Sequence, residues 1–278
     1  MKQNIKIAFI GGGNMAMAMA SGMIGTVCQA GDILVIDINT AGHARWHEKG
    51  VKTSAQVTAD LAQCKVWIYA VKPQNMHEAI ESSKTHLQPD TLVISIAAGL
   101  NTQSLSTWLG SWQSPSPGLV RVMPNTPALI GKGVTGLYAM PSLAEKDILL
   151  AEQILSSIGS VVRVQDENLL DAVTALSGSG PAYVFLLIES LIDGAKALGL
   201  EYNQAKKLAI ETVLGSAGLA AASDLEPGTL RENVTSKGGT TAAALAVFEQ
   251  HAFRDTVKQA MKAASDRAVE MSRELGKT

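Results

Sequence analysis

The chain of 278 residues contains few cysteines and little excess charge. Cys28 and Cys64 are too few for a disulfide framework and do not have the spacing of metal ligands, so we expect both to be buried. With 23 Lys and Arg against 25 Asp and Glu, the net charge of −2 predicts no nucleic-acid partner and no attraction to an anionic membrane surface. The length allows about two domains with a large buried core.

Long apolar runs and targeting signals are also missing. The longest apolar stretch, 182–188, ends at Glu189 and is far shorter than the ~20 residues of a membrane-spanning helix. No charged segment followed by an apolar run and a cleavage site precedes the first strand-like segment. We therefore expect a cytoplasmic protein without a membrane partner.

Clusters of metal-binding or nucleophilic residues are not apparent either. The histidines all fall on predicted helices or helix ends: His43, His47, His77, His86 and His251. No metal site and no nucleophilic triad can be assembled from their spacing, so we expect no metal cofactor.

An apolar segment at 5–10 runs directly into three glycines and then a predicted helix. This order presents backbone N–H groups and a helix N-terminus to a pyrophosphate. Gly11 permits the tight turn, Gly13 lets the diphosphate approach the backbone, and Ala16 keeps helix and strand close. A glycine triplet alone is also typical of a plain turn, so its surroundings decide the interpretation.

A second apolar strand ends at Asp37, 24 positions after Gly13. This spacing is close to the roughly 20 residues expected for the acidic residue that binds a ribose 2′-hydroxyl. Together the two features predict a dinucleotide site.

Short apolar runs alternate with helical segments up to residue 164, which predicts an α/β fold with a Rossmann-type, doubly wound, mainly parallel sheet. The runs are 5–10, 33–37, 66–71, 92–97, 119–123, 134–140 and 161–164. A serine- and proline-rich segment at 111–118 predicts a loop. We expect a dinucleotide-binding domain at 1–164.

From residue 165 to 278, strand-like runs give way to helical spacing. Apolar residues follow it through 176–198, 204–222 and 242–275. We therefore predict an all-helical domain at 165–278. Many of its helices are apolar on more than one face, which favours burial against a second subunit.

Open parallel sheets bind ligands beyond the carboxyl ends of their strands, so the residues at those ends are candidates. They are Ala70, Val71, Lys72 and Pro73, then Ala97 and Ala98, then Asn125. Pro124 and Pro127 fix the loop around Asn125 and free its polar side chains to face a ligand, although a rigid surface turn is the alternative. Lys72 is also typical of an ordinary solvated lysine.

Two segments of the helical half combine glycine with hydroxyl-bearing residues. Ser179 is predicted to cap a long helix, with Pro181 in its first turn. At 233–241, two glycines and two threonines precede an apolar helix, and their N–H groups and the helix dipole suit a small carboxylate. A simple helix cap is the alternative for this second segment.

A redox enzyme with no obvious acid or base among its residues suits a substrate that needs little help with proton transfer. A protonated imine is such a substrate, because its cationic C=N bond is already electrophilic and hydride addition neutralises it.

Six segments, in order along the chain, closely resemble those of the pyrroline-5-carboxylate reductases. They are 11–15, 70–73, 95–99, 121–127, 177–183 and 236–241. The resemblance implies reduction of 1-pyrroline-5-carboxylate to L-proline by NADPH or NADH, the last step of proline biosynthesis. It also implies a homodimer formed through the helical domain, in some members joined into larger rings.

The same resemblance implies roles for the cofactor-binding candidates. The diphosphate is implied to bind at Gly11, Gly12, Gly13, Asn14 and Met15. The adenosine side is implied to be lined by Val71 and Lys72, with their neighbours Ala70 and Pro73. Ala97, Ala98 and Asn125 flank the nicotinamide. Asn233, and Asp224 near it, match positions close to the cofactor or active site of the dimer.

For the substrate, the resemblance places the carboxylate on the backbone N–H groups near Gly239 and Thr240. The substrate-binding candidates are Ser236, Gly238, Gly239, Thr240 and Thr241. The Thr241 hydroxyl is implied to hydrogen-bond the ring nitrogen and is our catalytic candidate. We expect catalysis to come mainly from orientation and electrostatic placement.

The chain departs from the family pattern in two places. Lys237 stands where the family often has proline, so this loop has lost a rigid residue. Asp37 stands where members that prefer NADPH usually carry a small hydroxylated or neutral residue. A carboxylate there repels a 2′-phosphate and accepts a hydrogen bond from a ribose hydroxyl, so we predict appreciable NADH use.

Three other functions are considered. A β-hydroxyacid dehydrogenase places a catalytic lysine on the helix after a glycine-rich turn, and here no lysine follows Gly180 until Lys196. A reductase of a related cyclic imine differs in pocket size, which the sequence does not reveal. A nicotinamide-sensing binding protein without turnover is disfavoured by the intact pair Thr240 and Thr241.

Overall fold

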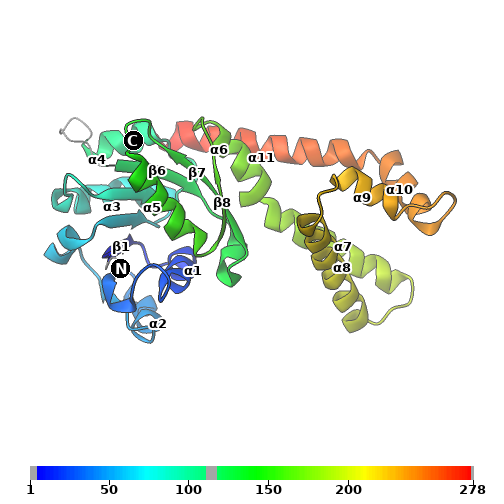
Figure 1. Ribbon diagram of the computed structural model, residues 1–278, viewed down its shortest axis with the longest axis horizontal. Coiled ribbons are helices and arrows are strands. Elements are labelled where there is room, and N and C mark those ends of the chain that lie inside the picture. Colours follow the sequence, from blue (N-terminus) through cyan, green and yellow to red (C-terminus); the bar gives the residue numbers. More distant parts are fainter. Residues whose placement is uncertain (1–4, 111–117, 277–278) are drawn as a thin grey trace. The chain divides into compact units, whose positions relative to one another are not determined.

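The computed structural model describes residues 5–110 and 118–276, so the predicted loop at 111–117 lies outside the described residues. The chain divides into two compact units (Figure 1). Unit 1 is Met1–Ser179 with Ala263–Thr278, and unit 2 is Gly180–Lys262. The division predicted after residue 164 follows the last strand, whereas compact unit 1 extends to Ser179 and includes the end of the chain.

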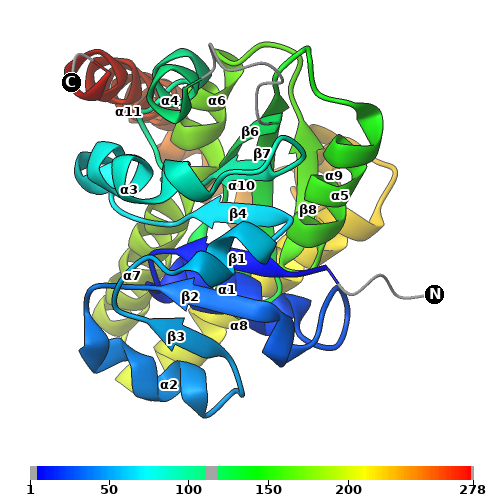
Figure 2. The ribbon, with the colours of Figure 1, turned by 90° about the vertical axis from the view of Figure 1, so that its left-hand side faces the viewer.

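An eight-stranded sheet with the order β3-β2-β1-β4-β5-β6-β7-β8 forms the centre of unit 1 (Figure 2). Its strands are β1 Ile7–Ile10, β2 Ile33–Ile36, β3 Lys52–Ser54, β4 Val66–Tyr69, β5 Leu92–Ser95, β6 Gly118–Met123, β7 Gly133–Ala139 and β8 Gly159–Arg163. Neighbouring strands pair in parallel, except that β6 and β7 are antiparallel. The strand order reverses between β1 and β4, as in a Rossmann sheet, which confirms the predicted fold class.

Helices cover both faces of this sheet. They are α1 Asn14–Met23, α2 His43–His47, α3 Met76–Ser83, α4 Thr102–Leu109 and α5 Glu145–Ser156. One apolar core packs α1 and α5 against the sheet, and the other packs α3 and α4 against the opposite face. Every residue of β1, β2, β4 and β5 is buried, because a parallel strand covered on both sides has no solvent face.

The sequence analysis missed β3. This strand has three residues, Lys52–Ser54, with no apolar side chain, and it lies at the edge of the sheet beside β2. An edge strand pairs with a neighbour on one side only and is partly exposed, so a short polar segment can form it without an apolar run.

The helical region contains α6 Leu169–Val173, a π-helical turn at Thr174–Gly178, α7 Gly180–Ala197, α8 Tyr202–Ala222, α9 Pro227–Asn233, α10 Thr240–Gln250 and α11 Phe253–Leu275. The predicted helix at 242–275 is interrupted, because Ala252 has a φ of +52° and separates α10 from α11. α9 was not predicted.

Ser179 is not a helix N-cap, so that prediction is wrong. The helix runs without a break from Leu169 to Ala197, and Ser179 lies inside it with helical φ and ψ. Its backbone N–H donates to the carbonyl of Thr174 at 2.8 Å, the i to i−5 bond of a π turn. The wider turn accommodates Pro181, which a regular helix interior tolerates poorly.

Candidate active site

The glycine turn between β1 and α1 has the geometry that the sequence predicts. Gly11 has a φ of +100°, and a Cβ there would lie 2.7 Å from the backbone of Ala70 at the end of β4. Gly13 precedes α1 without a side-chain cap, and a Cβ at this position would meet no other atom within 4 Å. The start of α1 therefore has space beside Gly13 and no side chain that caps it, as an anion site requires, while fully buried Ala16 packs in the core.

Asp37 lies directly against this turn, at the end of β2. Its Oδ2 accepts the backbone N–H of Gly12 at 2.7 Å, and its Oδ1 accepts that of Asn39 at 2.8 Å. A carboxylate oxygen can accept two hydrogen bonds, and each oxygen of Asp37 accepts one from a backbone N–H. Both oxygens can therefore accept a further bond from a ribose hydroxyl.

Arg45 on α2 brings a positive charge to the same turn. Its Nη2 donates to the carbonyl of Gly12 at 2.5 Å, and its Nη1 donates to Oδ1 of Asn14 at 3.1 Å. Its Nε is buried and has no hydrogen-bond partner in the described part of the chain. A carboxylate and a guanidinium thus flank one dinucleotide turn, and the sequence analysis did not single out Arg45.

The remaining cofactor candidates of unit 1 lie at one edge of the sheet. Residues 70–73 follow β4, residues 97 and 98 follow β5, and Asn125 follows β6. β1, β4, β5 and β6 follow one another in the sheet and run parallel, so the carboxyl ends of β4, β5 and β6 lie at the same end of the sheet as the glycine turn. Lys72 is exposed, whereas Ala97 is buried.

Asn125 is held by the protein itself. Its Nδ2 donates to the carbonyl of Ser177 at 3.0 Å, and its Oδ1 accepts the backbone N–H of Val134 at 2.9 Å. The residue is 7% exposed. Sequence reasoning expected an amide free to face a ligand, but most of this amide is engaged with backbone groups.

The substrate candidates lie in unit 2, at the start of α10. Gly238 has a φ of +73°, and Gly239 is the N-cap of α10 without a side-chain cap bond. Thr240 is exposed and Thr241 is half-buried in the first turn. Ser236 accepts the N–H of Gly239 through its carbonyl at 3.0 Å. Asn233 ends α9 and, like Asp224, is exposed.

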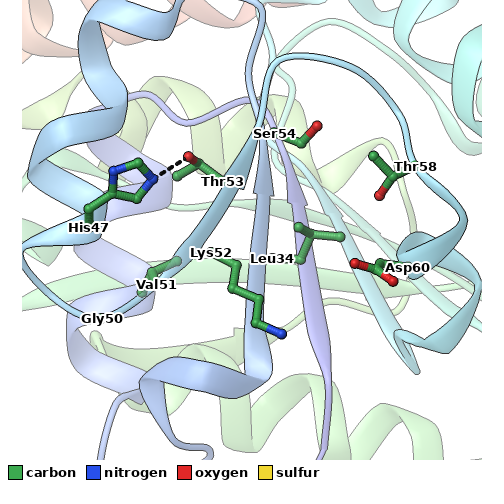
Figure 3. A pocket seen from close by; sticks show the side chains of 9 residues that line it. All are labelled: Leu34, His47, Gly50, Val51, Lys52, Thr53, Ser54, Thr58 and Asp60. Atoms are coloured by element: carbon green, nitrogen blue, oxygen red, sulfur yellow. Dashed lines mark hydrogen bonds between the residues drawn. The ribbon is translucent and has the colours of Figure 1, made fainter.

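The best-defined cavity, of about 530 Å³, lies elsewhere in unit 1, by the edge strand β3 (Figure 3). It is lined by Leu34, His47, Gly50, Val51, Lys52, Thr53, Ser54, Thr58 and Asp60. None of the predicted site residues lines it. An extended dinucleotide lies along strand ends, so the strand-end residues, rather than this cavity, form the candidate site.

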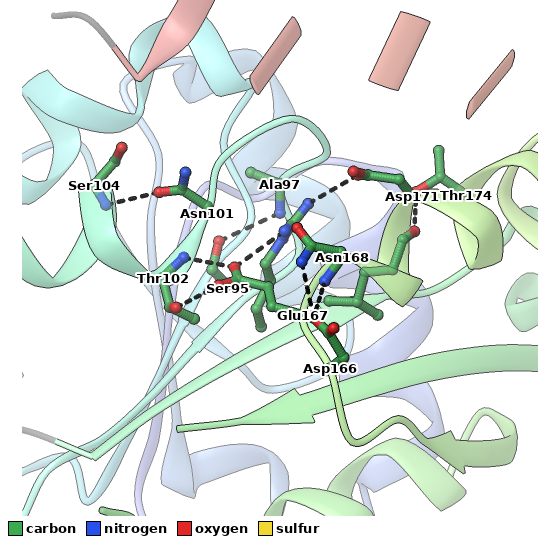
Figure 4. A network of polar contacts seen from close by, with 12 residues as sticks. Ser95, Ala97, Asn101, Thr102, Ser104, Asp166, Glu167, Asn168, Asp171 and Thr174 are labelled. Carbon is green, nitrogen blue, oxygen red and sulfur yellow. Dashed lines mark hydrogen bonds and ion pairs between the residues drawn. The ribbon is translucent and has the colours of Figure 1, made fainter. Parts of the chain in front are cut away.

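A buried charge network connects β6, the start of α4 and the segment that leads into α6 (Figure 4). Arg121 on β6 pairs with Glu167 at 3.0 Å, and Glu167 also accepts the backbone N–H and the hydroxyl of Thr102 at the start of α4, both at 2.6 Å. Arg121 Nη2 lies 3.8 Å from Asp171 Oδ1, which accepts no hydrogen bond in the described chain. Burial, with Glu167 adding to it, raises the pKa of Asp171 despite the opposing charge of Arg121.

This network was not predicted from the sequence. Its signal is one arginine inside an otherwise apolar strand, Gly118–Met123, followed later by closely spaced acidic residues. A lone charge in a central strand has to find a buried partner, because burying it unpaired is costly.

Cysteine and metal chemistry find no support in the described residues. Cys28 and Cys64 are buried free thiols, as predicted, and burial raises the pKa of each to about 11, so thiolate is scarce at neutral pH. No group of three His, Cys, Asp or Glu residues able to hold a metal ion occurs among residues 5–110 and 118–276.

The continuous helix Leu169–Ala197 is long and apolar enough to cross a membrane by length and composition. Core helices of proteins outside membranes pass the same test, so this helix is weak support for a membrane span. Much of its apolar surface is exposed, including Phe185 and Leu186.

Comparison with known proteins covers nearly the whole chain. A family model for pyrroline-5-carboxylate reductase dimerisation matches residues 167–271, and one for NADP oxidoreductase, coenzyme F420-dependent, matches residues 6–99. The pyrroline-5-carboxylate reductase of Pseudomonas aeruginosa is 40% identical over 275 residues, which cover 98% of each chain.

Two solved structures agree with this relationship. A pyrroline-5-carboxylate reductase from Coxiella burnetii matches with a TM-score of 0.90 and 37% identity, covering 97% of this chain and 99% of the other. The Plasmodium falciparum enzyme, solved with NADP bound, matches with a TM-score of 0.84 and 32% identity, covering 98% of this chain and 100% of the other. The chain therefore belongs to the pyrroline-5-carboxylate reductase family.

Proposed function

We propose that this protein reduces 1-pyrroline-5-carboxylate to L-proline with a nicotinamide cofactor, as the last step of proline biosynthesis in the cytoplasm. The observation that carries the proposal is the glycine turn at the start of α1, in a chain that aligns from end to end with reductases of this name. When bound, the nicotinamide supplies a hydride to the imine carbon, and the C=N electron pair passes to the nitrogen. The imine is protonated before the transfer, so the hydride neutralises its cationic C=N bond.

In this proposal unit 1 holds the cofactor. The uncapped N–H groups after Gly13, with Gly11, Gly12, Asn14 and Met15, bind the diphosphate. Residues 70–73 line the adenosine side. Ala97, Ala98 and Asn125 lie toward the nicotinamide, as expected from their place at the carboxyl ends of β5 and β6. Asn233 is the remaining residue of the proposed cofactor-binding set.

The start of α10 binds the substrate. The backbone N–H groups of Gly239 and Thr240, with Ser236 and Gly238 shaping the turn, bind the carboxylate, favoured by the positive end of an 11-residue helix. Thr241 hydrogen-bonds the ring nitrogen and so orients the imine carbon. This orientation is the catalytic contribution of the helix.

The helical unit forms a homodimer. Large apolar side chains stay exposed on α7 and α8, including Phe185, Leu186, Leu214 and Leu219. A monomer rarely exposes so much apolar surface, and a family model for dimerisation spans these helices. A second copy of the chain accounts for both observations.

The protein uses NADH appreciably as well as NADPH. The Asp37 carboxylate, beside the Gly12 N–H, accepts a ribose 2′-hydroxyl and repels a 2′-phosphate, while Arg45 supplies a counter-charge at the same turn. Asp37→Ser is expected to raise the NADPH over NADH ratio of kcat/KM by about tenfold, as removal of one repelling charge allows. A wild-type ratio strongly favouring NADPH, unchanged by the substitution, contradicts this preference.

The activity is tested by following NADH or NADPH oxidation with pyrroline-5-carboxylate, beside the six-membered cyclic imine carboxylate. We expect the five-membered substrate to be reduced faster. Thr241→Ala is expected to lower kcat by more than about tenfold, because an interaction that orients the reacting bond is lost. Oxidation of the six-membered imine alone identifies a reductase of a related imine, and no oxidation of either favours a binding protein.

A further inference from the structure

Asn125 connects three parts of unit 1 through one side chain. Its own loop follows β6, its Oδ1 accepts the N–H of Val134 in β7, and its Nδ2 donates to the carbonyl of Ser177 in the π turn. The amide is nearly buried, so these bonds are shielded from water. A loop residue therefore fixes the point from which the long helix continues into unit 2.

The Ser177 carbonyl is unusual because of the residue four positions later. In a regular α-helix the backbone N–H of residue 181 would donate to this oxygen, and residue 181 is proline, which has no N–H. The preceding turn is widened, since the N–H of Ser179 donates to Thr174. Asn125 Nδ2 thus donates to a carbonyl whose regular α-helical donor is missing, because residue 181 is proline.

Close packing keeps the strand end and the turn together. A Cβ at Gly178 would lie 2.6 Å from Cε of Met123, the last residue of β6. Glycine at this position lets the π turn approach the strand that leads to Asn125. Three residues therefore shape this turn. Gly178 allows the close approach, Pro181 leaves the Ser177 carbonyl without its regular donor, and Asn125 donates to that carbonyl.

We propose that Asn125 is a positioning residue that fixes the π turn Thr174–Gly178 through the Ser177 carbonyl. The Asn125 loop follows β6 among the strand-end residues assigned to the cofactor, so the same hydrogen bond holds this loop in place, and its loss disturbs the reacting geometry beside the nicotinamide. This last step rests on the proposed function. Direct contact with the nicotinamide is the competing role for the same side chain.

The first test is Asn125→Ala, assayed with NADPH and pyrroline-5-carboxylate. We expect kcat to fall by at least about tenfold while KM for NADPH stays within about twofold, because misplacement affects the reacting geometry more than cofactor binding. Amide deuterium exchange within Thr174–Gly178 should become faster. Ser83→Ala is the matched control, because it also removes a buried hydrogen bond, to the Tyr69 hydroxyl at 2.7 Å, away from the π turn.

The decisive test adds Pro181→Ala to both backgrounds. Alanine restores a backbone N–H that can donate to Ser177, so we expect Asn125→Ala to lose much less kcat and less exchange protection in this background than in the wild type. Equal losses in the two backgrounds, or a large rise in KM for NADPH, overturn the proposal and favour direct cofactor contact. An equal loss of kcat in Ser83→Ala overturns it too.

The exchange measurement separates this inference from the proposed function. If the wild-type protein does not reduce pyrroline-5-carboxylate, the proposed function fails. Deuterium exchange in the Asn125 and Pro181 variants does not depend on activity. It therefore still shows whether Asn125 fixes the π turn.

Discussion

The two units bury their apolar side chains to very different extents. Unit 1 has a core on each face of its sheet, and its buried arginine has two acidic neighbours. The described core of unit 2 consists of Ile192, Ala205 and Ala209, while most of its large apolar side chains are exposed. Unit 1 is therefore stabilised by its own contacts, whereas unit 2 requires cover from another chain.

The two glycine-rich helix starts follow the same contrast. Around Gly11 and Gly12, a Cβ would contact β2, β4 and α2, so the cofactor turn is enclosed by its own unit. At the start of α10, a Cβ added at Gly238 would meet nothing within 4 Å, a Cβ at Gly239 would meet only Ser236 of the same turn, and α10 has no buried residue. The turn proposed to bind the cofactor is held by contacts within its own unit, whereas the segment proposed to bind the substrate has few such contacts.

The largest effect is expected from Arg121→Met. This change leaves Glu167 and Asp171 close together without their counter-charge, so the free energy of unfolding should fall by about 3–5 kcal/mol. Urea unfolding followed by circular dichroism measures it. Arg163→Met, which removes an exposed ion pair with Glu145 at 3.0 Å, should cost no more than about 1 kcal/mol. Similar losses of unfolding free energy in the two variants would mean that the buried network stabilises unit 1 no more than an exposed ion pair does.

The next effect contrasts Gly11→Ala with Gly238→Ala. Both glycines have positive φ, so each substitution carries backbone strain of about 1–2 kcal/mol. At Gly11 the methyl group also meets the Ala70 backbone, which adds about 1–3 kcal/mol and moves the turn. We expect Gly11→Ala to abolish measurable NADPH binding in a fluorescence titration. If Gly238→Ala weakens NADPH binding equally, the two helix starts do not have separate roles.

Leu214→Glu tests the dependence of unit 2 on a second copy. Leu214 on α8 is 64% exposed, and a glutamate there would be buried unpaired in a helical dimer interface, so the dimer should dissociate at micromolar concentration. Light scattering coupled to gel filtration reports the mass. Leu149→Glu, at a 54% exposed position on α5 of unit 1, is the matched control and should leave the dimer intact. Dissociation by Leu149→Glu alone would place the dimer contact on unit 1.

Local sequence patterns predicted the parts of the fold that local physics determines. The apolar runs correspond to seven of the strands, and the glycine turn and Asp37 meet as their spacing indicates, with Asp37 2.7 Å from the Gly12 nitrogen. The start of α10 after Gly239 also follows from composition alone. These features depend on residues close together in the chain or on a repeating strand–helix pattern.

Features that depend on distant partners were not predicted. Ser179 and Pro181 have the pattern of a helix start, but they lie inside a helix whose Ser177 carbonyl accepts a hydrogen bond from Asn125, over fifty residues earlier. The sequence marks Arg121 only as a lone charge in an apolar strand, because its partners Glu167 and Asp171 lie more than forty residues later and meet it only in the folded chain. Arg45 meets the glycine turn only once α2 folds against β1. Such pairings exist only in three dimensions.

The smallest effect concerns the pH dependence of unit 1. Burial raises the pKa of Asp171 in the folded protein above its unfolded value, so the unfolded chain loses its proton first as pH rises. The ionised group therefore makes the fold less stable above the folded-state pKa than below the unfolded one. Asp171→Asn should raise the free energy of unfolding at pH 7, with Arg121 still paired to Glu167, and this gain should shrink toward pH 4. Asp193→Asn, on a side chain that is 79% exposed, controls for the loss of one acidic group. A variant that is less stable than wild type at pH 7, and equal to it at pH 4, would mean that the attraction of Arg121 outweighs the cost of burial at Asp171.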